Sequence, residues 1–222
     1  MVDAPDMTDL TLDELRLAMA GDVASAAIFD GWSDAALEHA AQMADVDPDV
    51  ARLAYSGGAM DMIAAWIASI DLAMVEALPP EKLAEMKIRE RIRALVAFRL
   101  EATTGSEEAL RRALAVMAMP QNVPQALKLG WKSADIMWRL AGDTATDYNH
   151  YTKRTILAGI YAAVLPVFVD DESEGKADSY AFLDRRIDGV MKFEKAKAKW
   201  LGRERETFSV SRFLGRLRYP AR

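Results

Sequence analysis

The amino-acid sequence predicts an all-α protein, a bundle of about ten helices. In nearly every segment the apolar residues recur at helical spacing, and no stretch alternates apolar and polar residues between turn signals as a β-strand does. Of the 222 residues, 51% are hydrophobic and 28% are charged. This composition is typical of a folded chain with a substantial core.

Glycine, proline and acidic turns separate the helical segments. These breaks occur at Gly31, Gly57-Gly58, Pro79-Pro80, Gly105-Ser106, Pro120, Gly142 and 170–175. We therefore expect helices, in order, over 11–28, 33–45, 48–54, 58–77, 80–103, 106–118, 122–141, 146–169, 175–201 and 208–218. Ser106, followed by Glu107 and Glu108, should cap a helix. Gly142 should end a helix in the left-handed conformation, and Pro166 should bend or end the helix around it.

Composition also limits the class of protein. The longest uncharged apolar run, 155–169, has fifteen residues. A membrane-spanning helix needs roughly 20, so we expect a buried core helix. The acidic start shows no secretory signal. Without a span or a signal, we expect a soluble protein. With no Cys there is no disulfide, thiolate nucleophile or zinc–thiolate site.

The carboxy-terminal stretch "TFSVSRFLGRLRYPAR" has the pattern of a basic amphipathic helix at a membrane surface. The expected membrane-binding residues are Val210, Arg212, Phe213, Leu214, Arg216 and Leu217. A terminal helix docked on the core is the alternative. Residues 191–222 hold ten basic against three acidic residues, whereas residues 1–60 hold twelve acidic against two basic. This asymmetry favours the membrane surface, because an anionic leaflet attracts the tail and repels the amino-terminal part.

Residues 34–67, "DAALEHAAQMADVDPDVARLAYSGGAMDMIAAWI", resemble the helix-turn-helix module of TetR-family repressors. The segment that would read DNA follows Asp45, Asp47 and Asp49, and its only basic residue is Arg52. Because DNA affinity depends on phosphate contacts from Lys and Arg, we expect a retained scaffold that binds no nucleic acid. A TetR-like ligand-responsive transcription regulator is the alternative function.

Few residues in the chain are typical of catalysis. His39 and His150 are its two histidines, and it lacks the Glu-x-x-His and HExxH metal motifs as well as GxGxxG, P-loop and GxSxG motifs. We therefore expect no catalytic residues, no metal and no cofactor. An enzyme that uses the Asp-Tyr-His cluster over 147–151 remains a minor alternative.

The helices expected over 122–141 and 146–169 have extensive apolar faces. Leu127, Trp131 and Trp138 follow one face of the first, and the second is apolar all round beyond Arg154. Spacing alone favours an ordinary core over a long apolar pocket. The residues that would flank a lipid in such a pocket are Leu127, Trp131, Met137, Trp138, Ile160, Tyr161, Val164, Leu165 and Phe168.

The stretch "SADIMWRLAGDTATDYNHYTKRTILAGIY" (133–161) resembles the signature of the ubiquinone-biosynthesis accessory family, the ninth protein of the coenzyme Q series. The similarity continues through "FVDDESE" and "FLDRRIDGVMKF" to about residue 193. It implies a TetR-like helical bundle without DNA binding. It also implies a cavity for an isoprenoid or quinone lipid, attachment to a membrane surface, and assistance to the di-iron demethoxyubiquinone hydroxylase.

The resemblance further implies a hydroxylase-binding patch at Asp147, Tyr148, His150, Tyr151 and Arg154, where His150 replaces the family's usual Trp. We divide the chain into a degenerate helix-turn-helix region (1–78), a helical lipid-binding domain (79–206) and the membrane-binding helix (207–222). The expected protein is a non-enzymatic accessory factor, a homodimer, located in the cytoplasm on the inner face of a bacterial cell membrane.

Overall fold

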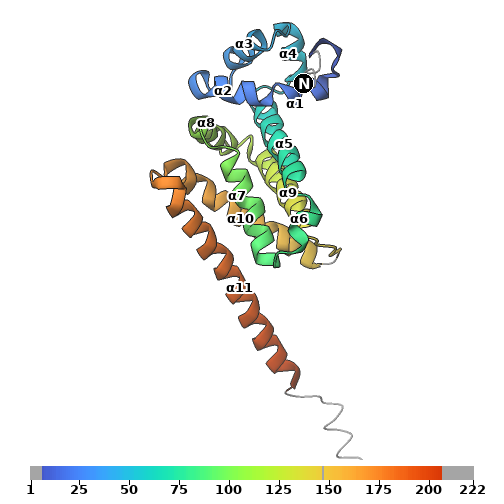
Figure 1. Cartoon of the computed structure of the whole chain (residues 1–222), viewed down its shortest axis with the longest axis vertical. Helices are drawn as coiled ribbons and strands as arrows, with labels where there is room; N and C mark the ends of the chain where they lie inside the picture. Colours follow the sequence, from blue (N-terminus) through green and yellow to red (C-terminus); the bar gives the residue numbers. More distant parts are fainter. Residues whose placement is uncertain (1–6, 147, 207–222) are drawn as a thin grey trace, which may run out of the picture.

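The computed structural model describes residues 7–146 and 148–206, and over these residues it is helical without strands (Figure 1). The elements in order are η1 (Met7–Asp9), α1 (Leu12–Ala18), α2 (Ala20–Asp30), α3 (Asp34–Met43), α4 (Pro48–Ala54), α5 (Ala59–Ala77), α6 (Pro80–Ala84), α7 (Ile88–Glu101), α8 (Glu107–Met117), α9 (Val123–Leu140), α10 (Tyr148–Asp170), η2 (Glu174–Lys176) and α11 (Ala177–Glu206). The predicted all-α fold is confirmed. The helix expected over 208–218 lies outside the described residues.

Two helices that the sequence predicted as continuous are divided. The one expected over 11–28 separates at Met19 into α1, which packs on α4, and α2, which packs on α3. The one expected over 80–103 separates into α6 and α7, because Lys87 is extended and its backbone N–H donates to Glu90 Oε2 at 3.0 Å. A carboxylate at the third helical position caps a new helix start in this way.

Helix α5 connects the group of helices α1–α4 to the rest of the bundle. It contacts α1 and α2 on one side and α7, α8 and α9 on the other, and Figure 1 shows it leaving the α1–α4 group to join the remaining bundle. Trp32, after α2, packs on Trp66 of α5 with ring centroids 5.4 Å apart and donates its indole N–H to Ala109 O at 2.9 Å. Buried residues from α1 to α11 accordingly form one continuous core.

The ends of the helices around the site follow local chemistry. Gly142 follows α9 with φ +90°, and its N–H donates to Arg139 O at 3.0 Å, while Asp143 N–H donates to Trp138 O at 2.9 Å. This Schellman arrangement confirms the predicted left-handed cap. Ser106 precedes α8 but makes no side-chain capping bond. Pro166 does not end α10, which continues to Asp170.

Helices α3 and α4 form the expected helix-turn-helix-like pair. Arg52, the one basic residue within these two helices, is ion-paired with Glu38 of α3 and with Asp49 of α4. Asp47 caps α4 through the N–H of Asp49 at 2.8 Å. Neutralisation of Arg52 by two carboxylates leaves this face acidic.

Helix α10 is both long and apolar. Over Asn149–Asp170 its length and composition alone would suffice to cross a membrane, and the bent pair α4–α5 passes the same test together. In the described structure, however, α10 packs against α7, α8, α9 and α11, and its Arg154, Leu157 and Phe168 are buried. One face of α10 is therefore packed in the core, and 39% of its apolar window is buried.

Candidate functional site

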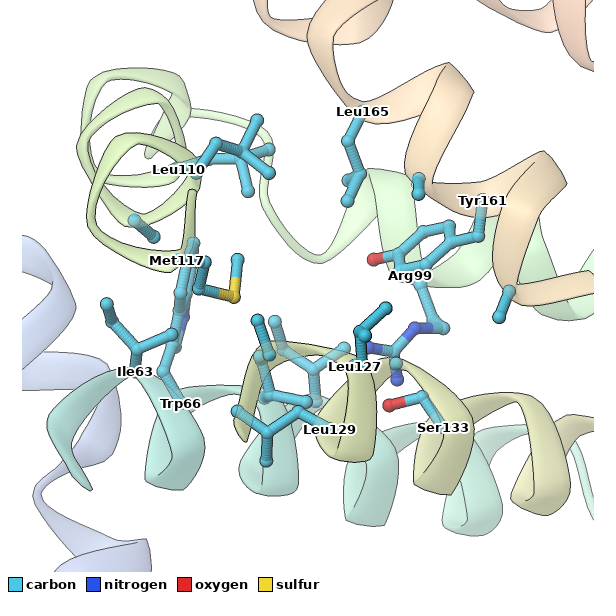
Figure 2. Close-up of a pocket in the computed structure, with 18 of the residues that line it drawn as sticks. Ile63, Trp66, Arg99, Leu110, Met117, Leu127, Leu129, Ser133, Tyr161 and Leu165 are labelled. Carbon is cyan, nitrogen blue, oxygen red and sulfur yellow. The ribbon is translucent and has the colours of Figure 1, made fainter. Parts of the chain in front are cut away.

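An apolar cavity of about 300 Å³ lies between α5, α7, α8, α9 and α10 (Figure 2). Its walls are aliphatic and aromatic side chains, with Ile63 and Trp66 from α5, Leu110 from α8, Leu129 from α9 and Leu165 from α10. Cavities of this size and character, with few polar groups, are typical of sites for small apolar ligands.

The cavity opens between the end of α8 and the start of α9. Val123 and Leu127 line it, yet their side chains are 39% and 70% exposed, and Met119 beside them is 44% exposed. Large apolar side chains at the rim of a cavity are unfavourable in water unless something covers or enters it. The rim is therefore suited to an apolar ligand that passes through it.

One end of the cavity is polar. Arg99 of α7 and Ser133 of α9 line it and are only 2% and 1% exposed. Asp71 of α5 pairs with Arg99 Nη1 and accepts the Ser133 hydroxyl at 3.0 Å. The Tyr161 ring of α10 covers the guanidinium, with Arg99 Cζ 4.9 Å from the ring centroid. Burial raises the pKa of Asp71, and Arg99 and Ser133 offset only part of that rise.

The nine residues predicted to flank lipid divide into three groups. Leu127, Tyr161 and Leu165 line the cavity. Met137, Val164 and Phe168 are fully buried in the core, and Ile160 packs beside it; none of the four is among the cavity's lining residues. The two tryptophans, Trp131 and Trp138, also lie away from its walls.

Sequence reasoning missed the walls that α5, α7 and α8 contribute. Ile63, Trp66 and Ile70 recur along α5 at helical spacing, and the whole helix is strongly apolar. That signal was present in the sequence. The predicted division of the chain places most of α5 in the helix-turn-helix region (1–78). Because α5 lines the cavity, the cavity is not confined to residues 79–206.

An aromatic patch, defined here as Trp131, His150 and Tyr151, lies on the first turns of α10 and the facing side of α9. The Trp131 and Tyr151 rings are stacked with centroids 6.0 Å apart, and the His150 ring meets Tyr151 edge-on at 5.1 Å. His150 Nδ1 donates to Ala145 O at 2.9 Å, since a carbonyl only accepts. Tyr151 is 61% exposed, so the patch presents an accessible aromatic surface.

Arg154 does not belong to that surface, contrary to the sequence expectation. Its side chain is 2% exposed, and it donates to Asp135 Oδ1 at 2.5 Å, Asp143 Oδ2 at 3.0 Å and His150 O at 3.1 Å. Lys153 adds a 2.6 Å ion pair to Asp143. Although burial opposes it, hydrogen bonds from Lys153 and Arg154 hold the pKa of Asp143 below its ordinary value. Arg154 thus joins α10 to α9 from inside the protein.

The remaining predicted site residues cannot be placed. Asp147 and the six membrane-binding residues of the tail lie outside the described residues, and the Tyr148 side chain is not described either. Within 7–146 and 148–206, no group of three or more His, Cys, Asp or Glu residues is arranged to hold a metal ion.

Comparisons with known proteins match both the fold and the signature sequence. The COQ9 family model matches residues 123–194. The mitochondrial ubiquinone biosynthesis protein COQ9 of Rattus norvegicus is 33% identical over 72% of this chain and 54% of its own length. The Homo sapiens COQ9 is 30% identical over 72% of this chain and 52% of its own length. The chain thus spans about half the length of these curated relatives.

Among solved structures, a TetR transcriptional regulator from Nitrosomonas europaea has a TM-score of 0.64 and 19% identity, over 79% of this chain and 97% of its own. This confirms the TetR-like fold and no more. The expected location on a bacterial cell membrane is wrong, because the matched relatives are named mitochondrial proteins. Charge patterning favours a surface but does not distinguish one compartment's membrane from another's. The resemblance predicted from the sequence is confirmed: this chain is similar to the COQ9 ubiquinone biosynthesis proteins, and the match to the COQ9 family model covers residues 123–194.

Proposed function

We propose that this protein is a non-enzymatic accessory factor of ubiquinone biosynthesis that binds an isoprenoid quinone precursor and presents it to the di-iron demethoxyubiquinone hydroxylase. The observation that carries the proposal is the apolar cavity, two of whose walls, α9 and α10, lie within the residues that the COQ9 family model matches. The names of the relatives support the pathway. The exposed aromatic patch supplies a surface on which the hydroxylase docks.

In this proposal the α1–α4 region is a scaffold, residues 79–206 with α5 hold the lipid, and residues 207–222 attach the protein, as a homodimer, to a membrane surface. A TetR-like regulator is the weaker candidate. Its reader helix would be α4, where Arg52 is already paired with Glu38 and Asp49. Such a helix offers DNA phosphates no free cation of its own.

Two glycines provide a matched test of the cavity. Gly130 of α9 lines it, Gly159 of α10 does not, and a Cβ added at either position meets no atom within 4 Å. We expect lipid to co-purify with the wild type and with Gly159→Phe when membranes are extracted gently. Gly130→Phe should lower lipid occupancy by about tenfold or more, because overpacking of a filled site is costly.

The readout is mass spectrometry of the extracted lipids. Absence of any lipid from the wild type, or equal occupancy in the two phenylalanine variants, would contradict lipid binding in this cavity. A gel shift with DNA at low salt separates the two candidate functions, since only a regulator should retard the DNA.

A further inference from the structure

The opening of the cavity carries an exposed apolar surface. Met119, Val123 and Leu127, called here the rim, are 44%, 39% and 70% exposed. Val123 and Leu127 lie one helical turn apart on α9 and also line the cavity, and Met119 lies in the turn that joins α8 to α9. Exposed apolar side chains that continue an apolar cavity mark a surface that meets an apolar phase or another macromolecule.

The backbone at the rim is hydrogen-bonded within the chain. The Met119 N–H donates to Val116 O at 3.2 Å. Met119 O accepts from the N–H groups of Asn122 and Val123 at 2.8 and 3.2 Å. The Asn122 side chain donates to Val116 O at 2.9 Å. Because backbone groups without partners are costly in the low-polarity part of a bilayer, this turn can enter it more readily than an open loop can.

The charge around the rim suits an anionic surface. Residues 113–134 contain no Asp or Glu, although the whole chain has 34 acidic against 28 basic residues. The charged side chains of this stretch are Lys128 and Lys132, both exposed on α9. Apolar side chains flanked by lysines are typical of a helix that lies at the interface of a bilayer with anionic lipids.

Exposure of an apolar side chain does not by itself define such a surface in this protein. Met43, at the end of α3, is 76% exposed, but Asp45, Asp47 and Asp49 follow it closely in the sequence. An anionic leaflet would repel that region. The rim differs because its exposed apolar side chains have basic neighbours and are continuous with the cavity.

We propose that the rim is a second membrane-contact surface, whose three apolar side chains enter the interface of an anionic bilayer while Lys128 and Lys132 contact lipid phosphates. The proposal rests on the membrane attachment in the proposed function, in which residues 207–222 recruit the protein. It adds a contact made by the folded part of the chain. Such a contact reaches about 5–10 Å into the bilayer. The mouth of the cavity then faces lipid rather than water.

The chain has no Cys, so a single introduced cysteine can carry a reporter at a chosen place. Met119→Cys and Leu127→Cys test the rim, and Met43→Cys is the matched control. Each full-length variant is labelled with the environment-sensitive fluorophore NBD and mixed with vesicles of phosphatidylcholine and phosphatidylglycerol. Nitroxide groups on the acyl chains of some of the lipids quench a label that enters the bilayer, and flotation reports binding in parallel.

We expect nitroxide quenching of the two rim variants and none of Met43→Cys. Adding Lys128→Glu to Leu127→Cys should raise the lipid concentration for half-maximal quenching by about tenfold, because the charge reversal removes an attraction and adds a repulsion. Lys82→Glu, at an exposed lysine of α6, changes the net charge equally and should have a much smaller effect.

Rim variants that float with the vesicles while their labels stay unquenched would overturn the rim contact and leave attachment by the tail in place. Quenching of Met43→Cys equal to that of the rim variants, or equal effects of the two lysine reversals, would also overturn it. Failure of the labelled proteins to float would instead overturn the membrane attachment in the proposed function, and the rim contact with it.

Discussion

At the scale of single residues, two buried arginines stabilise the site. Arg99 joins α7 to Asp71 of α5, and Arg154 joins α10 to Asp135 and Asp143 at the end of α9. Nothing in the sequence distinguished them from surface cations, because their partners are set by packing. The sequence does not indicate Arg99 as a site residue and predicts Arg154 on the exposed side of α10, whereas both are buried.

Arg154→Met removes the charge while keeping most of the side-chain volume. We expect a loss of about 3 kcal/mol in the free energy of unfolding, because Asp135 and Asp143, both largely buried, each lose the buried one of their two cationic partners. Arg139 pairs with the same Asp135 but is 71% exposed, so Arg139→Met should cost less than about 1 kcal/mol. Urea unfolding of both variants measures the difference. Similar losses would show that burial of Arg154 does not matter.

Asp171 predicts how stability depends on pH. It accepts hydrogen bonds from the backbone and hydroxyl groups of Ser173 and Ser179 at 2.5–2.8 Å, which hold its pKa far below the ordinary value. Because the folded-state pKa is the lower one, this stabilisation is complete above pH of about 4 and is lost as the pH falls below that. Urea unfolding from pH 6 to the acid limit should show a steeper decline for the wild type than for Asp171→Asn. An equal decline of the unfolding free energy with pH in both proteins would show that Asp171 does not determine the acid dependence of stability.

At the scale of elements, the sequence predicted best where periodicity and punctuation agree. The expected helices over 122–141 and 146–169 match α9 and α10 closely, and Gly142 ends α9 as expected. The breaks at Met19 and Lys87 were missed because neither residue is a glycine or proline, and Gly21, close to the first break, lies inside α2. The spacing of apolar residues predicted that α9 has two apolar faces. It could not show which face lines a cavity, since core and cavity walls have the same composition.

We expect the aromatic patch on α9 and α10 to form part of the surface that binds the hydroxylase. Tyr151→Ala should weaken capture of the di-iron hydroxylase by about thirtyfold, since an aromatic anchor at an interface centre contributes about 2 kcal/mol. Lipid content should remain normal, because Tyr151 does not line the cavity. Leu72→Ala, on the exposed side of α5, is the control. Binding unchanged in Tyr151→Ala, measured by surface plasmon resonance, would remove the patch from the interface.

At the scale of the whole molecule, the TetR-like fold was predictable because helix order and lengths carry it, and the comparison confirms it at 19% identity. The cavity was only partly predictable, since its lining side chains come from five helices and are spread over residues 63–165. The charge asymmetry between the two ends of the chain is a property of the sequence alone. It predicts how the molecule orients on a charged surface.

Deletion of residues 207–222 should abolish flotation with liposomes that contain anionic lipid, because four arginines in that segment each contribute on the order of 1 kcal/mol at such a surface. Arg212→Glu with Arg216→Glu should have much of the same effect, and raised salt should imitate it for the wild type. Flotation that survives the deletion and is insensitive to salt would assign membrane binding to another surface.

The central claim, that the cavity between α5 and α10 holds an isoprenoid lipid, is tested most directly by photo-crosslinking. An isoprenoid quinone analogue with a diazirine in its tail would be irradiated with the full-length protein, and the labelled peptides identified by mass spectrometry. We expect label on the wall residues Ile63, Trp66, Leu110, Met117 and Leu165, and its loss in Gly130→Phe but not in Gly159→Phe. Label confined to exposed apolar residues elsewhere, such as Phe29 and Met43 of α2 and α3, would contradict the account.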